Sequence, residues 1–112
     1  MEFGEMVGKA RLVREEYAAV EARRYGRSWS REELMLGFVG DVGDLAKLVQ
    51  GKEGVRARDD LDAALAHELA DCLWSVMVLA DAYEVDLESA FLQTMDALSN
   101  QLAGDGGLDG GA

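Results

Sequence analysis

The chain has 112 residues, no proline, and a formal net charge of −11 that arises from 22 acidic and 11 basic side chains. This length predicts one domain with its own core, and the abundance of Ala, Leu, Val and Glu predicts an all-α fold. The negative charge argues against nucleic-acid binding, since a basic face is the usual footprint of that function. The single cysteine, Cys72, excludes an internal disulfide.

The basic residues are confined to the first half of the chain, between Lys9 and Arg58. Any cation that contacts an anionic ligand must therefore come from this half or from a partner subunit. No segment has the properties of a signal peptide or a membrane span. The most apolar run, Cys72 to Ala80, is about half as long as a bilayer crossing requires. We therefore expect a cytoplasmic protein that does not contact a membrane.

Apolar residues at helical spacing predict four helices in a single domain. In chain order they run from about Phe3 to Tyr25, from Ser30 to about Gln50, from about Asp60 to Tyr83, and from Leu87 to about Leu102. Ser30 and Glu33 predict a capping box at the start of the second helix, and Gly51 and Gly54 predict its end. Asp86 is expected to cap the fourth helix. The all-α domain thus covers residues 1–103, and the Gly-rich residues 104–112 are expected to form a disordered tail.

Two features suggest how these helices pack. The third helix is apolar on nearly all sides between Cys72 and Ala80, which predicts the most buried helix of the fold. The second helix contains Gly37, Gly40 and Gly43, each of which costs about 1 kcal/mol relative to Ala. Such a spacing of glycines indicates that another backbone or a ligand approaches closely, and the sequence leaves both alternatives open.

Two acidic pairs interrupt the apolar stripes of the second and third helices. Asp41 and Asp44 form one pair and Glu68 and Asp71 the other, each at i, i+3 spacing, so the members of a pair share one helix face. Two unit charges about 4 Å apart repel by about 4 kcal/mol at an effective dielectric near 20, so four crowded carboxylates need a neutralising partner. The predicted partner is a hard divalent cation, Mg²⁺ or Mn²⁺.

A magnesium ion held in this way is typical of enzymes that act on phosphoanhydrides, because it screens the phosphates and can lower the pKa of a bound water. We expect Asp41, Asp44 and Asp71 to be metal ligands. Glu68 is either a ligand or the catalytic group that positions the attacking water. His67 is interpreted as a surface or interface residue, since no second His or Cys lies at ligand spacing.

Three further residues are expected to bind a substrate: Tyr25, Trp29 and Lys52. The rings of Tyr25 and Trp29 can stack on a base, although either residue is more often a core anchor at a helix end. A simple helical oligomerisation domain, in which arginines of the first helix neutralise the acids, is a separate alternative. A buried pair of that kind often adds little net stability.

Two motifs carry a resemblance to a known family. Gly-Asp-Val-Gly-Asp-Leu-Ala (40–46), followed by His-Glu-Leu-Ala-Asp-Cys-Leu-Trp (67–74), resembles the MazG-like nucleoside triphosphate pyrophosphohydrolases, and among them the dCTP pyrophosphatases. The resemblance covers about residues 17–98. It implies a four-helix bundle-like fold assembled as a dimer or a dimer of dimers, with a Mg²⁺ site between helices of neighbouring subunits. It also implies hydrolysis of a nucleoside triphosphate to a monophosphate and pyrophosphate, as a house-cleaning activity.

The chain departs from the family pattern at several positions. Asp41 and Asp44 stand where the family has Glu, so each carboxylate reaches about 1 Å less far, and metal geometry is sensitive to such a change. Thr94 and Leu98 stand where a phosphate-binding Lys and Asn are usual, and Trp29 replaces a His of the substrate pocket. Two hypotheses follow: a pyrophosphohydrolase with altered substrate preference, or a catalytically weakened relative that serves as a nucleotide- or metal-binding regulatory module.

Overall fold

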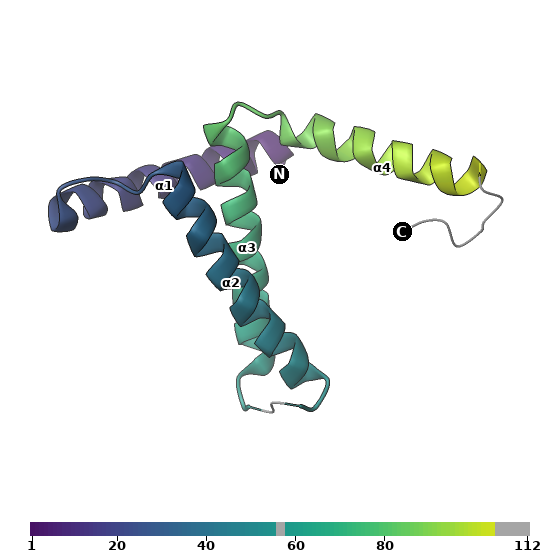
Figure 1. The fold of residues 1–112 in the computed structure, drawn as a ribbon, viewed down its shortest axis with the longest axis horizontal. Coiled ribbons are helices and arrows are strands. Elements are labelled where there is room, and N and C mark those ends of the chain that lie inside the picture. Colours follow the sequence, from purple (N-terminus) through teal and green to yellow (C-terminus); the bar gives the residue numbers. More distant parts are fainter. Residues whose placement is uncertain (56–57, 105–112) are drawn as a thin grey trace.

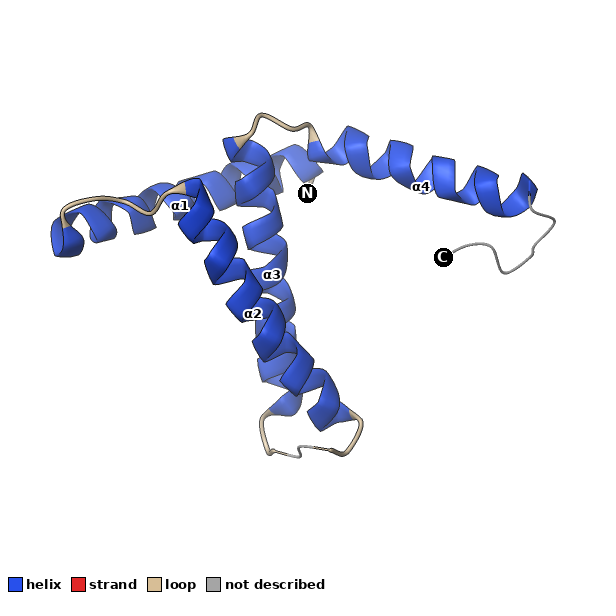
Figure 2. Cartoon of the chain, in the orientation of Figure 1, coloured by secondary structure: helices blue, strands red, loops and turns tan. Residues whose placement is uncertain are grey.

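The structure is a computed structural model that describes residues 1–55 and 58–104. Within these residues the chain forms helices and no strand, which confirms the all-α class (Figure 2). The helices are α1 (Phe3–Tyr25), α2 (Arg31–Lys52), α3 (Leu61–Ala82) and α4 (Leu87–Gly104). Each boundary lies within about two residues of the sequence prediction, which is the usual uncertainty of helix ends. Gly104, assigned to the tail from sequence, ends α4, and residues 105–112 lie outside the described residues.

The helix ends form largely as their residues predict. Ser30 caps α2: its Oγ accepts a hydrogen bond from the Glu33 N–H at 3.2 Å, and Glu33 Oε1 accepts one from the Ser30 N–H at 2.9 Å. Asp86 Oδ1 accepts the Ser89 N–H at 3.1 Å at the start of α4. Gly51 does not end α2, because it stays helical and buried; the chain turns instead at Gly54, whose φ of +87° is a left-handed conformation that favours glycine.

Helices α2 and α3 form an antiparallel hairpin, and α1 crosses the upper half of α3 (Figure 1). At this crossing Trp74 Nε1 donates a hydrogen bond to the Ala10 carbonyl at 3.1 Å, and the ring of Trp74 lies 5.7 Å from that of Tyr17. Arg11 forms an ion pair with Asp81 nearby. Helix α3 is thus the central element, as predicted, and it contributes the buried residues Ser75, Met77 and Val78. 

Helix α4 projects away from the other three helices, so the bundle is open within one chain (Figure 1). None of its residues is buried. Its apolar side chains lie in solvent, with Phe91 58% exposed. The radius of gyration is 17.6 Å, whereas a compact domain of this length has one of about 13 Å. The apolar surface that a closed bundle would bury therefore remains uncovered.

Three glycines of α2 have no close neighbour among the described residues. A Cβ atom built on Gly37, Gly40 or Gly43 would meet no atom of another described element within 4 Å. The close approach of another backbone, one of the two alternatives from sequence, is therefore not made by the described residues.

Helix α3 is also the one described helix that is long and apolar enough to cross a membrane, with a mean hydropathy of 1.4 over its most apolar window. The prediction of no membrane span rested on the run from Cys72 to Ala80, which is much shorter than the whole helix. Core helices of soluble proteins share this length and apolarity. Here α3 contacts α1 and α2 and carries Glu68 and Asp71 within its apolar sequence.

Candidate metal and substrate site

Three carboxylates meet where α2 faces α3. One oxygen each of Asp41, Asp44 and Glu68 lies within 4.8 Å of the others. Asp41 and Asp44 come from one face of α2, and Glu68 comes from the facing side of α3, so the i, i+3 spacing and the hairpin together bring them into one cluster. Asp41 and Glu68 are partly buried and Asp44 is exposed, which leaves the cluster open to solvent on one side.

The environment of this cluster disfavours its negative charge. Burial, and then the charges of Asp71 and Asp44, raise the pKa of the Asp41 carboxyl. Burial, and then the charges of Asp41, Asp71 and Asp44, raise the pKa of Glu68. Glu68 Oε1 is buried and accepts no hydrogen bond from the described residues. An all-oxygen donor set with an unpartnered buried oxygen fits a hard divalent cation.

The arginines of α1 do not neutralise these acids. Arg14 pairs with Glu21 and Arg11 pairs with Asp81. Among residues 1–55 and 58–104, no Lys or Arg forms an ion pair with the three clustered carboxylates. Within one chain, the pairing with arginines of the first helix that the oligomerisation-domain alternative supposes is therefore not made by the described residues.

Asp71, the fourth predicted ligand, lies outside the three-residue group. Its Oδ2 atom lies 3.2 Å from Nε2 of His67, a residue that precedes Asp71 by one turn of α3. The charge of Asp71 still raises the pKa of Asp41 and of Glu68. His67 has a side chain that is 73% exposed, in agreement with its interpretation as a surface residue.

A cavity of about 200 Å³ opens between α1, α2 and α3, and Asp41 lies in its wall. Apolar and aromatic side chains form most of the lining: Tyr17, Trp29, Leu34, Phe38, Trp74 and Val78. Trp29 was predicted as a substrate contact, and Tyr17 and Trp74 were not, since their helical spacing indicated only packing. Tyr25, also predicted, stacks on Trp29 at a ring distance of 5.3 Å.

A second cavity, of about 300 Å³, lies on the other side of the cluster. Asp44 and Glu68 line it together with Lys47, Arg58 and His67. Sequence reasoning missed both cations, although Lys47 follows Asp44 by three residues and therefore shares its helix face. Lys52, the cation that was predicted, pairs with Asp62 and is not among the lining residues of either cavity.

The fold and the site thus define a class of protein: a helical protein whose central hairpin carries a carboxylate cluster between an apolar cavity and a cavity of mixed charge. The model of the MazG nucleotide pyrophosphohydrolase domain matches residues 29–101, and the chain belongs to this family. The matched region contains α2, α3 and nearly all of α4, and therefore all three clustered carboxylates.

Relatives among well-characterised proteins are all named dCTP pyrophosphatase 1. The human protein is 38% identical over 81 residues, which cover 62% of this chain and 46% of the human one. The bovine protein is 39% identical over 79 residues, which cover 62% of this chain and 47% of the bovine one. The match thus spans about half the length of these relatives. No solved structure gives a significant match.

Proposed function

We propose that the chain is a Mg²⁺-dependent nucleotide pyrophosphohydrolase that cleaves a (deoxy)nucleoside triphosphate between the α and β phosphates. The products are a monophosphate and pyrophosphate, and the role is house-cleaning in the cytoplasm, on free nucleotides rather than on nucleic acid or at a membrane. The observation that carries the proposal is the cluster of Asp41, Asp44 and Glu68, whose unpartnered Glu68 oxygen lies among carboxylates that repel one another.

In this proposal the carboxylates of Asp41, Asp44 and Glu68 hold the cation, and Asp71 completes the ligand set after a change of its side-chain rotamer. Mg²⁺ is favoured over softer metals because every donor is an oxygen, and Mn²⁺ can replace it. When bound, the metal would screen the phosphate charge and lower the pKa of a bound water. Glu68 positions the water that attacks phosphorus, and the bond from that phosphorus to the bridging oxygen breaks.

The two cavities suggest how the nucleotide lies. The base fits the aromatic cavity, where Trp29 can stack on it while Tyr25 supports Trp29. The phosphates then pass Asp41 and reach the mixed-charge cavity, where Lys47 offers donors, as does Arg58, which also pairs with Asp60. These two cations take the place that the family gives to residues at positions 94 and 98.

We also propose that the active form is a homodimer or a dimer of dimers. The support is the open fold: α4 has no buried residue and presents Phe91, Met95 and Leu98 to solvent. An exposed apolar face of this kind on a soluble protein marks an interaction surface. A second copy would cover it and could also approach the glycine face of α2.

A catalytically weakened relative that binds nucleotide or metal is the second candidate. Asp41 and Asp44 have shorter side chains than the Glu of the family, and Thr94 and Leu98 lie on the projecting helix α4. Both candidates bind nucleotide or metal, so turnover distinguishes them.

The test is product analysis with Mg²⁺ and a panel of canonical and modified nucleoside triphosphates. Monophosphate together with pyrophosphate supports the enzyme, and the order of the substrates describes the pocket. Mg²⁺-dependent thermal stabilisation without turnover of any nucleotide would favour the binding module.

A further inference from the structure

Glu21, near the end of α1, is an acidic residue that the proposed chemistry does not use. It is only 6% exposed, whereas carboxylates are almost never buried unless they are paired. It lies on another helix than the metal cluster and lines the aromatic cavity. Its burial therefore needs an explanation of its own.

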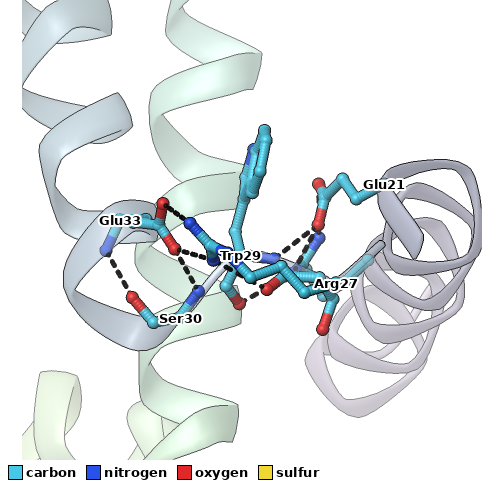
Figure 3. Close-up of polar contacts among 7 residues, drawn as sticks. Glu21, Arg27, Trp29, Ser30 and Glu33 are labelled. Atoms are coloured by element: carbon cyan, nitrogen blue, oxygen red, sulfur yellow. Dashed lines mark hydrogen bonds and ion pairs between the residues drawn. The ribbon is translucent and has the colours of Figure 1, made fainter. Parts of the chain in front are cut away.

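Glu21 and Arg14 together hold the backbone of Trp29. Glu21 Oε1 accepts the Trp29 N–H at 2.8 Å (Figure 3). Arg14 donates to both oxygens of Glu21, at 3.0 and 3.1 Å, and its Nη2 also donates to the Trp29 carbonyl at 3.3 Å. Burial alone would raise the pKa of Glu21, but the hydrogen bonds from Arg14 and from the Trp29 N–H outweigh it, and the pKa lies below its usual value. The pair is therefore ionised at neutral pH.

The same segment is fixed from its other side. Arg27 donates to both carboxylate oxygens of Glu33, at 2.6 and 2.8 Å, and its guanidinium lies 5.7 Å from the centre of the Trp29 ring. Figure 3 shows that the indole of Trp29 points away from these polar contacts. The residues between α1 and α2 thus have no helical structure and are nevertheless held by two bidentate Arg–Glu pairs.

We propose that the Arg14–Glu21 pair is a positioning device for substrate selection: it fixes the backbone of Trp29 so that the indole forms a rigid wall of the base cavity. This inference rests on the proposed function. A wall held through two backbone groups cannot yield to a base of the wrong size, whereas an apolar contact alone discriminates weakly. In this role Glu21, which also lines the cavity, acts through the backbone of Trp29 and holds no metal.

The test measures kcat and KM for a panel of triphosphates in the parent chain and in Glu21→Ala. We expect the kcat/KM of the best substrate to fall about tenfold, mainly through KM, and the ratio of best to worst substrate to shrink by a similar factor. Glu21→Gln, which keeps the acceptor oxygen, should restore most of the ratio. Arg14→Lys, which loses the bidentate geometry, should reproduce part of the loss and replaces Glu21→Ala if that variant does not fold.

Asp81→Asn is the matched control, because it removes another ion pair of α1 that does not contact residue 29. It should lower the melting temperature while leaving the substrate ratio unchanged. If the ratio of best to worst substrate in Glu21→Ala equals that of the parent chain, the inference is overturned and the proposed function is left intact.

A second readout needs no turnover. In a Trp74→Phe background, the fluorescence of Trp29 should become more accessible to acrylamide in Glu21→Ala and remain unchanged in Asp81→Asn. Unchanged quenching in Glu21→Ala would also overturn the inference. A parent chain that neither hydrolyses nor binds any triphosphate would overturn the proposed function and the selective role together, while the quenching data would still decide whether Glu21 holds Trp29.

Discussion

The α2–α3 hairpin and helix α4 depart from the usual distribution of residues in opposite directions. The hairpin places carboxylates in a partly buried seam, where Glu68 Oε1 has no hydrogen-bond partner among the described residues. Helix α4 leaves Phe91, Met95 and Leu98 in solvent and buries nothing. Each region is thus incomplete in one chain. The carboxylate cluster of the hairpin has no cationic partner among the described residues, and α4 has no apolar partner there. In the proposed function, a metal ion supplies the first and a second copy of the chain supplies the second.

The largest effect is expected in the hairpin. Glu68→Gln should reduce pyrophosphate release by about 100- to 10,000-fold, because a neutral amide neither orients water as a base nor binds a hard cation well. Measurement of pyrophosphate with saturating Mg²⁺ tests this, with circular dichroism as the check on the fold. Normal activity of this variant would show that the site is assigned to the wrong residues.

The next effect concerns α4 alone. Phe91→Glu places a charge on its exposed apolar face and should convert the oligomer to monomers, since a buried unpaired charge is strongly unfavourable. Sedimentation velocity measures the change. Gln93→Glu adds the same charge on the opposite side of the helix and should leave the oligomer intact. A parent chain that is already monomeric at micromolar concentration would contradict the proposed assembly.

A third experiment tests the repulsion among the clustered carboxylates and their binding of metal. Asp41→Asn relieves repulsion in the cluster and should raise the melting temperature of the metal-free protein by about 2–5 °C. The same variant should lose most of the stabilisation by Mg²⁺, because a ligand is missing. Differential scanning fluorimetry with EDTA and with Mg²⁺ provides both values. A metal-free Asp41→Asn that is less stable than the parent would indicate that the carboxylate has a partner.

The mixed-charge cavity gives a smaller effect. Arg58→Ala should raise the KM for triphosphates about three- to tenfold with little change in kcat, because Arg58 is half exposed and its contribution is screened. Steady-state kinetics measures it, and Arg24→Ala, at the exposed end of α1, is the control. An equal rise in both variants would reflect net charge rather than a phosphate contact.

The smallest effect is expected at the start of α2, away from the carboxylate cluster. The Arg27 guanidinium, and then the Ser30 N–H, lower the pKa of Glu33 to about 2. Because the folded-state pKa is depressed, the pair stabilises the protein fully above the unfolded pKa, and this stability is lost as the pH falls through about 2. The difference in urea midpoint between the parent and Glu33→Gln should therefore be largest near pH 7 and vanish near pH 2. A difference that is independent of pH would contradict the pairing.

The sequence predicted whatever depends on local spacing. The capping box of Ser30 and Glu33 and the shared faces of the acidic pairs follow from residues within one turn, and the cluster of Asp41, Asp44 and Glu68 needed only that two successive helices pack. The open position of α4 was not predicted, because the sequence pattern of its apolar face is the same whether that face packs against its own chain or against another chain. The place of Arg58 and the Glu21–Trp29 contact were missed because they depend on the conformation of loops. The spacing of apolar residues, which predicts helices, carries no information about loop conformation.

The contacts of Trp29 have one more consequence. Glu21 accepts the hydrogen bond of its N–H and Arg14 donates one to its carbonyl, so these hydrogen bonds make no demand on the side chain itself. Any residue other than proline at position 29 could be held in the same place. The backbone contacts that hold position 29 beside the cavity are therefore independent of which side chain stands there. A single codon change can replace the side chain that lines the cavity and leave the carboxylate cluster unaltered.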